Sequence, residues 1–403
     1  MRLFAANILP PDWKVTSIEK LCERVTSGGT PSRRQSSYYN GDIPWVKTQE
    51  LRDCWIVDTE EHLTEVGLRN SSAKILPQHT ILMAMYGATV GRLGILIKPM
   101  TCNQAACAMI VDANVADYRY VYYQLLLARP QIFDLANGAA QQNLSGATIK
   151  SLELPLPPLP EQLGISATLG AIDDKIESNR RVAELSFELA QCLYVEASAS
   201  ASKLPLMSVG SVVLGGTPDR KNKTFWSNGT VAWINSGAAN QDVILEASEL
   251  ITVEGLARSA AKMMPAGATV IAITGATLGQ VSLLGIPTSG NQSVVGVWAE
   301  DENLTSWLHF AIRAAIPELI GSATGAAQQH VNKKNVEELL VTVPDARTLS
   351  LWATLAIPLI TKSVTSLKEN LALRSLRDTL LPELLSGRIR VPEAFEVVRE
   401  GVA

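Results

Sequence analysis

The sequence is poor in the residues that supply cross-links or bulk charge. Only five of the 403 residues are cysteines, an odd number with no C-x-x-C spacing, so neither a disulfide framework nor a zinc site is indicated. Charged residues make up 18%, and the net charge is −4 with an isoelectric point near 5.7. This balance argues against a protein that binds nucleic acid through bulk positive charge, and a phosphate-binding surface would need local clusters of lysine and arginine.

Long apolar runs are also missing. Residues 81–85 and 270–273 are apolar runs of strand length, far short of the roughly 20 residues that a membrane helix requires. The first residues contain one arginine, a brief apolar stretch and two prolines, without the longer apolar region and cleavage site of a signal peptide. We therefore expect a cytoplasmic protein without membrane association.

The signatures of several enzyme classes are missing too. There is no G-x-x-x-x-G-K-[ST] loop and no H-E-x-x-H pattern, and we find no carboxylate cluster with a nearby lysine of the kind that nucleases use. The two Pro-Pro pairs follow leucines and precede no aromatic residue, unlike the [Asn/Asp]-Pro-Pro-[Tyr/Phe] loop of DNA amino-methyltransferases. We expect no catalytic site, no metal site and no cofactor bound by this chain.

What is present is enough apolar sequence for more than one domain, and much of it occurs twice. Hydrophobic residues make up 47% of a chain longer than one core normally organises. Residues 83–110 align without gaps with residues 271–298, with nine identities in 28 positions at a shift of 188. GGTP occurs at 28–31 and 215–218, and GAAQQ at 138–142 and 325–329. The order and spacing of these blocks indicate an internal duplication whose repeat is a whole domain.

Each copy alternates short β-branched runs with glycine, proline and asparagine, a pattern typical of strands joined by turns. The expected strands are residues 80–85, 90–97, 108–111, 269–274, 278–284 and 293–298. Residues 118–128 and 304–316 have the pattern of short helices. We therefore expect each copy to be a mixed α/β domain with a mainly antiparallel sheet.

A different pattern follows each copy. Apolar residues recur at Ile165, Leu169, Ile172 and Ile176 in the first stretch, and at intervals of three or four from residue 357 to 371 in the second. Such heptad-like spacing predicts two long helices that pack against each other. Pro358 should kink the second helix or mark its true start.

Basic residues follow both GGTP turns, where a glycine-rich backbone could approach a phosphate. They are Arg33 and Arg34 in the first copy and Arg220, Lys221 and Lys223 in the second. The alternative is that these are solvated loop charges, but their recurrence in both copies favours a contact with DNA.

Polar residues of the types that bond base edges follow the matched tryptophans, Trp45 and Trp233. They are Lys47, Thr48 and Gln49 in the first copy and Asn235 and Ser236 in the second, and polar capping of the strand ends is the open alternative. The tryptophans themselves should be core residues. The repeated Asn-Gln pairs at 103–104 and 291–292 are more simply turn residues that bond their own backbone.

The GAAQQ segments are the remaining candidates, because they are small, polar and repeated. Their candidate DNA-binding residues are Gln141, Gln142, Gln328 and Gln329, followed in the second copy by His330, Lys333 and Lys334. The three basic residues make the second segment the better candidate for phosphate.

Taken together, these blocks resemble the specificity subunits of type I restriction–modification systems. The resemblance rests on GGTP with its downstream aromatic pair, on GDIPW at 41–45, on PLPPLPEQ at 155–162 and on the tail LRDTLLPELLSG at 376–387. It covers nearly the whole chain. In the second copy VPDAR at 343–347 stands in place of a clear P-L-P-x-x-E-Q step.

The resemblance implies an α+β fold with two duplicated target-recognition domains, separated by two long helices that form an antiparallel coiled-coil spacer. Each domain would read one half of a split, asymmetric site in double-stranded DNA. Two methylation subunits, which carry S-adenosylmethionine, would dock on the helices, and restriction subunits would then join. The expected boundaries are 1–158 and 203–344 for the two domains, 159–202 and 345–392 for the two helices, and 393–403 for a tail.

Two other functions stay open from sequence alone. One is a methyltransferase or nuclease whose catalytic motif has diverged beyond recognition. The other is a duplicated binding protein for a ligand other than nucleic acid, such as a carbohydrate.

Overall fold

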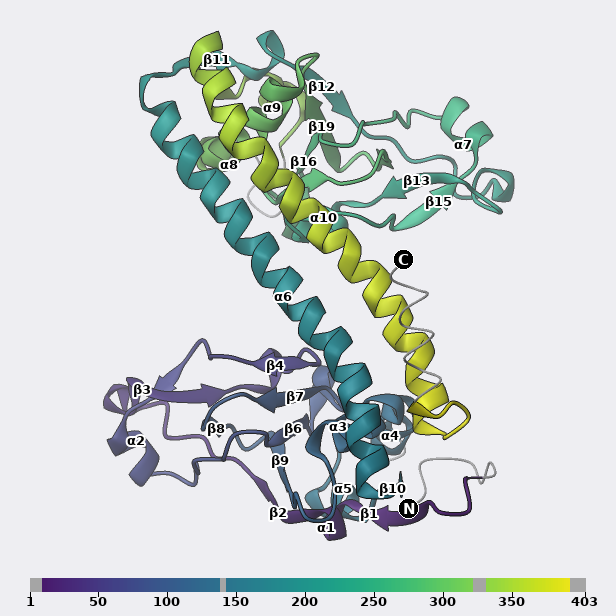
Figure 1. Ribbon diagram of the computed structural model, residues 1–403. Helices are drawn as coiled ribbons and strands as arrows, with labels where there is room; N and C mark the ends of the chain where they lie inside the picture. Colours follow the sequence, from purple (N-terminus) through teal and green to yellow (C-terminus); the bar gives the residue numbers. More distant parts are fainter. Residues whose placement is uncertain (1–8, 138–142, 322–330, 392–403) are drawn as a thin grey trace. The chain divides into compact units, whose positions relative to one another are not determined.

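The computed structural model describes residues 9–137, 143–321 and 331–391. The chain forms two compact units, which we call unit 1 and unit 2 (Figure 1). Unit 1 consists of Met1–Lys175 together with Leu373–Ala403, and unit 2 is the continuous stretch Ile176–Ala372.

Unit 1 has three small sheets. Its strands are β1 (Lys14–Ser17), β2 (Cys22–Ser27), β3 (Tyr39–Val46), β4 (Cys54–Ile56), β5 (His62–Leu63), β6 (Ile81–Ala84), β7 (Leu93–Leu96), β8 (Thr101–Cys102), β9 (Ala106–Val111) and β10 (Glu153–Leu156). They pair in the orders β2-β9-β6-β7-β4, β5-β3-β8 and β1-β10. Its short helices are α1 (Ile18–Leu21), α2 (Glu65–Arg69), α3 (Tyr118–Leu127), α4 (Arg129–Asn137) and α5 (Gly146–Ser151).

Unit 2 repeats this plan. Its strands are β11 (Ser202–Pro205), β12 (Ser211–Leu214), β13 (Val231–Ile234), β14 (Val243–Ile244), β15 (Glu249–Ile251), β16 (Thr269–Ala272), β17 (Val281–Leu284), β18 (Ser289–Gly290), β19 (Val294–Trp298) and β20 (Leu340–Val343). They pair as β12-β19-β16-β17-β14, β15-β13-β18 and β11-β20. Its own helices are α7 (Val253–Ala257), α8 (Glu302–Gly321) and α9 (Lys333–Glu338).

The two units therefore share one topology, strand for strand, as the duplicated sequence predicts. The same two pairs are parallel in each unit, β4 with β7 and β3 with β8 in unit 1, and their equivalents β14 with β17 and β13 with β18 in unit 2. The other pairs are antiparallel, so the expected mixed α/β domain with a mainly antiparallel sheet is confirmed.

Two long helices, α6 (Leu159–Ala197) and α10 (Ala346–Leu385), each contribute to both units (Figure 1). In unit 2 the core joins Phe187 and Tyr194 of α6 to Trp352 and Ile360 of α10, so the end of one helix lies beside the start of the other. The helices thus pack antiparallel, as predicted. Pro358 lies inside α10, which begins at Ala346, so of the two alternatives expected for this proline the helix start is excluded.

The junction in unit 2 includes a polar layer as well as this apolar core. The side-chain amide of Asn179 donates to Glu369 at 2.8 Å, and that of Asn370 donates to the backbone oxygen of Ile176 at 3.0 Å. Asn179 and Asn370 are both buried. A buried, hydrogen-bonded asparagine in a helix pair favours one register over its neighbours, since any slip would leave the amide without a partner.

Unit 1 is completed by the last part of α10. Arg377 donates to Asp173 of α6 at 2.9 Å, and the hydroxyl of Tyr123 donates to the same carboxylate at 2.7 Å. The side-chain amide of Gln124 reaches the backbone oxygen of Leu385 at 3.2 Å. Leucines of this helix end are buried, and they are Leu380, Leu381, Leu384 and Leu385. The end of the described chain is therefore part of the same core as its beginning.

Candidate nucleic-acid interface

The GGTP loop of each unit is fixed by its two glycines. Backbone hydrogen bonds hold the second glycine of each loop to the end of the short strand before the Asn-Gln pair. The N–H of Gly29 donates to Cys102 at 2.9 Å, and that of Gly216 donates to Gly290 at 2.7 Å. A Cβ on Gly29 would overlap the backbone of Ser72 and Ala73, and one on Gly216 would overlap its equivalent, residues 260–261. Only glycine fits, so the loop has one position relative to the strands around it.

The matched tryptophans form the floor of this loop. Trp45 and Trp233 are 1% and 2% exposed, which confirms the prediction that they are core residues. Each indole N–H donates to the backbone oxygen of the second glycine of its loop, Trp45 to Gly29 at 2.9 Å and Trp233 to Gly216 at 3.1 Å.

The Asn-Gln pairs also contact the GGTP loops. The threonine of each GGTP loop donates its hydroxyl to the glutamine, Thr30 to Gln104 and Thr217 to Gln292, the latter at 2.6 Å. Asn291 accepts from the backbone N–H of Ser293 at 3.0 Å, as expected of a turn residue. These residues are repeated because they hold the loop to the neighbouring turn.

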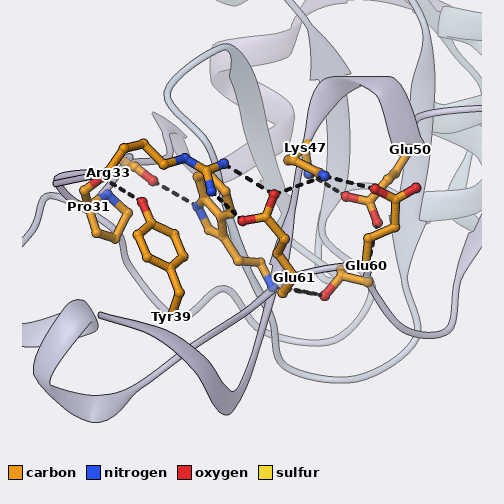
Figure 2. Close-up of polar contacts among 10 residues, drawn as sticks. Pro31, Arg33, Tyr39, Lys47, Glu50, Glu60 and Glu61 are labelled. Carbon is orange, nitrogen blue, oxygen red and sulfur yellow. Dashed lines mark hydrogen bonds and ion pairs between the residues drawn. The ribbon is translucent and has the colours of Figure 1, made fainter. Parts of the chain in front are cut away.

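The first arginine after each loop is engaged by its own unit. Arg33 forms a two-pronged ion pair with Glu61 (Figure 2). Its guanidinium group lies over the rings of Tyr39 and Trp45, at 4.6 and 4.8 Å from their centroids. The hydrogen bond from Arg33 lowers the pKa of Glu61, so the pair is fully ionised at neutral pH. The carbonyl oxygen of Pro31 accepts from Tyr39 at 2.7 Å, which ties the ring beneath the arginine to the loop.

Unit 2 contains the same arrangement. Arg220 donates to both oxygens of Glu249 at 2.6 and 2.8 Å and lies 3.6 Å from the centroid of Trp226 and 4.9 Å from that of Trp233. The hydrogen bond with Arg220 lowers the pKa of Glu249. We call each of these groups, Arg33 with Glu61 and Arg220 with Glu249, an arginine clamp.

The clamps supply a structural reason for the recurrence of these arginines, beside the predicted DNA contact. Sequence reasoning missed the two glutamates, although Glu61 and Glu249 stand 188 positions apart, the same shift as the larger repeat.

Lys47 also binds the glutamate of the first arginine clamp. Its ammonium group donates to Glu60 at 2.8 Å and to Glu61 at 3.0 Å, and Figure 2 shows Glu61 between Arg33 and Lys47. Hydrogen bonds to these carboxylates, first Glu60 and then Glu61, raise the pKa of Lys47. Its charge is thus largely neutralised within the unit.

The polar residues next to the tryptophan strands divide into capping and exposed groups. Thr48 is buried, Ser236 is half-buried, and Asn235 is exposed but accepts from the backbone N–H of Gly237 at 2.9 Å. Gln49 is exposed. Asn235 therefore caps the turn after its strand, as the alternative interpretation has it, and a base contact of Gln49 remains a prediction.

The other predicted cations also differ in their partners. Within the described residues, Arg34, Lys221 and Lys223 are exposed and have no ion pair. Lys333 and Lys334 each pair with a glutamate one turn along α9, at 2.9 and 3.6 Å. The remaining candidates lie outside the described residues, and they are Gln141, Gln142, Gln328, Gln329 and His330.

Neither a metal site nor a membrane helix is found in the described part of the chain. No three histidine, cysteine, aspartate or glutamate side chains there come together as metal ligands would. None of the described helices has the length and apolar character needed to cross a membrane.

The chain is thus a duplicated protein, in which two copies of one domain are each joined to the same pair of long helices. Comparison with known proteins agrees. The family described as type I restriction modification DNA specificity domain matches residues 10–185 and 204–348, so the chain belongs to this family.

The chain is also similar to individual members of the family. It is 25% identical to the MjaIX type I restriction enzyme specificity subunit of Methanocaldococcus jannaschii over 96% of this chain and 95% of that one. The EcoR124I/EcoR124II specificity subunit of Escherichia coli is 24% identical over 58% of this chain and 61% of its own. The crystal structure of a type I restriction–modification S subunit from M. genitalium has the same fold, with a TM-score of 0.61 and 17% identity over 95% of this chain and 98% of that chain.

These findings confirm the resemblance and the fold class inferred from sequence. They also make the chain a non-catalytic DNA-recognition subunit, and they do not favour the alternatives of a diverged enzyme or of a binding protein for another ligand.

Proposed function

We propose that this chain reads a split, asymmetric DNA sequence, with one half-site assigned to each unit, and directs methylation and restriction subunits to it. The observation that carries this proposal is that both units have the same structural frame around the GGTP loop but different exposed residues on it. The glycine loop, the tryptophan floor and the arginine clamp occur in both units. Arg34 and Gln49 of unit 1 are not repeated in unit 2, where Lys221 and Gly237 occupy the matching positions. One frame with two sets of side chains suits two different half-sites.

The proposed partners follow from the same assignment. Two methylation subunits would dock on the α6–α10 helix pair and would carry the S-adenosylmethionine, and restriction subunits would join that complex in the cytoplasm. The role of this chain is then to bind and position DNA, because the reacting groups belong to its partners.

The direct test exchanges one recognition domain. Residues 1–158 are replaced by the equivalent domain of a relative, the variant is expressed with the cognate methylation subunits, and the methylated sequence is determined genome-wide. We expect one half of the site to change and the other to stay. The wild-type chain expressed without partners is the control, and it should methylate nothing.

Two results would contradict the proposal. A change in both half-sites would show that the units do not read DNA separately. Methyl transfer by the purified chain alone would show that it carries a catalytic site.

A further inference from the structure

A lysine occupies the same place beside the GGTP loop in both units. Residues 71–77 (SSAKILP) match residues 259–265 (SAAKMMP) at the shift of 188 that relates the two copies, with identical residues at four of seven positions. Lys74 and Lys262 are one such identical pair, and both are exposed. The two copies have thus kept an exposed lysine at the same place beside the loop.

Both lysines are held at a fixed position relative to the loop. The residue before each, Ala73 or Ala261, is buried against the tryptophan floor, and the second glycine of the loop abuts its backbone. Two residues after each lysine, the chain pairs with a neighbouring strand segment, with 2.8 Å hydrogen bonds from Leu76 to Met100 and from Met264 to Thr288. The lysine backbone is therefore anchored on both sides, while the side chain is exposed.

The charge on these lysines is not neutralised by the protein. The ammonium group of Lys74 donates to the hydroxyl of Thr26 at 2.9 Å, and within the described residues neither it nor Lys262 forms an ion pair. Arg33, Arg220 and Lys47, by contrast, are all held by glutamates. An approaching anion would not have to displace a carboxylate from Lys74 or Lys262.

The glutamine of the Asn-Gln pair supplies a neutral hydrogen-bond donor beside the same loop. Because the threonine hydroxyl donates to the side-chain oxygen of Gln104 or Gln292, the NH₂ group of that glutamine is left to donate elsewhere. Both glutamines are exposed. In each unit a positive charge and an amide donor thus flank one glycine loop.

We infer that Lys74 of unit 1 and Lys262 of unit 2 each contact a DNA phosphate, with Gln104 and Gln292 as accompanying donors. The inference rests on the proposed DNA-binding function and goes beyond it by assigning the contact. A phosphate suits these lysines better than a base edge, because an ammonium group is a point charge on a flexible stem and lacks the planar fork that reads guanine. A large apolar side chain follows each lysine, Ile75 at 51% and Met263 at 41% exposure, and it would lie against the sugar next to that phosphate.

The test measures the salt dependence of duplex binding by the complex with cognate methylation subunits. The variants are Lys74→Ala, Lys262→Ala and the double variant. Lys98→Ala is the matched control, because Lys98 is similarly exposed but pairs with Asp58 at 3.3 Å. Each complex is titrated with a duplex that contains the recognition sequence and with an unrelated duplex, between 50 and 200 mM salt.

We expect each lysine variant to lower the slope of log affinity against log salt by about 0.9, and the double variant by about 1.8. Over a fourfold change in salt, the double variant should therefore lose about 12-fold less affinity than the wild type does. The effect should be equal on both duplexes, with the methylated sequence unchanged, and Lys→Arg variants should restore the slope.

Three results would overturn the inference. In the first, the wild-type complex binds DNA but the double variant keeps its salt slope. In the second, a single variant relaxes one base position, which would make the lysine a base reader. In the third, Lys98→Ala shows the same effect, which would mean that any surface cation contributes. Failure of the wild-type complex to bind its duplex would instead refute the proposed function itself.

Discussion

Adjacent arginines with different surroundings allow a sharp prediction about the first GGTP loop. Arg33 is held by Glu61 and by two aromatic rings, whereas Arg34 has no ion pair within the described residues. Arg33→Ala should therefore destabilise unit 1, and Arg34→Ala should not. The two substitutions remove the same side chain at neighbouring positions, so each is a control for the other.

The size of the effect follows from the contacts. An exposed ion pair contributes about 0.2–1 kcal/mol, and a cation over an aromatic ring at an exposed site about 0.5–1 kcal/mol. Arg33 makes one such ion pair and lies over two rings, but its side chain is 54% exposed and water screens all three interactions. We expect Arg33→Ala to lower the free energy of unfolding by about 1–2 kcal/mol and Arg34→Ala to change it by less than about 0.5 kcal/mol.

Two assays separate stability from binding. Urea denaturation of the full chain measures the free energy of unfolding, and salt titration of duplex binding by the reconstituted complex measures phosphate contacts. If Arg34 contacts a phosphate, its loss should lower the salt slope by about 0.9 without destabilising the chain. The same comparison applies in unit 2 to Arg220 and Lys221.

The opposite pattern would refute this reasoning. If Arg33→Ala lowered the salt slope as Arg34→Ala does and left stability unchanged, then Arg33 would leave Glu61 to bind DNA. The clamp would then be a resting arrangement of a DNA-binding arginine and not a fixed part of the frame.

Three further predictions concern the frame, the core and the helices. Gly29→Ala should destabilise unit 1 by about 1–3 kcal/mol, because the added methyl group would overlap neighbouring backbone. Gly146→Ala should stabilise unit 1 by about 0.4–1 kcal/mol, because the space for its methyl group is empty. Thermal melts of the two variants compare these effects, and equal shifts in melting temperature would contradict the reasoning. Burial lowers the pKa of His309 from 6.5 to about 3, so the unfolded chain binds the proton first and stability falls as the pH drops from 6.5 towards 3, by about 1.4 kcal/mol per pH unit. The free energy of unfolding of His309→Phe, measured by urea denaturation, should not show this loss below pH 6.5. At neutral pH it should be about 1 kcal/mol lower than that of the wild type, since Thr269 loses its hydrogen-bond partner. A pH dependence identical to the wild type would show that His309 is not the titrating group. Adding one heptad after Glu177, with a matched heptad in α10, should widen the unread gap in the methylated sequence by about three base pairs, since seven residues add roughly 10 Å. An unchanged gap with activity retained would show that the helices do not set the spacing.

Repetition and local pattern were enough to predict the architecture. The duplication, the alternating strands and the heptad-like stripes each depend on residues close together in sequence or on exact recurrence, and these signals survive without coordinates. The burial of Trp45 and Trp233 follows from the same logic, because a large apolar residue within a strand pattern is most simply core.

The candidate site was harder because pairing between loops leaves no local trace. Arg33 meets Glu61 across 28 positions, and nothing at residue 33 says whether its charge faces solvent or a carboxylate. Recurrence in both copies cannot separate the two cases, because a structural clamp recurs as faithfully as a binding residue does. The sequence did not predict a role for Lys74 for a related reason. A single lysine carries no local signal of binding, and its place beside the GGTP loop is known only from the fold.

The discontinuous make-up of unit 1 has a consequence for biosynthesis. Unit 2 is complete once residue 372 has been synthesised. The core of unit 1 also needs Leu380, Leu384 and Leu385, which are among the last residues described. At roughly 5–20 residues per second, the ribosome takes about 10–40 s to cross the intervening 197 residues, from 176 to 372. During that interval the nascent first half exposes the apolar surface that the final helix will cover, and chaperones have time to engage it. The half of the chain that is made first is thus the half that matures last.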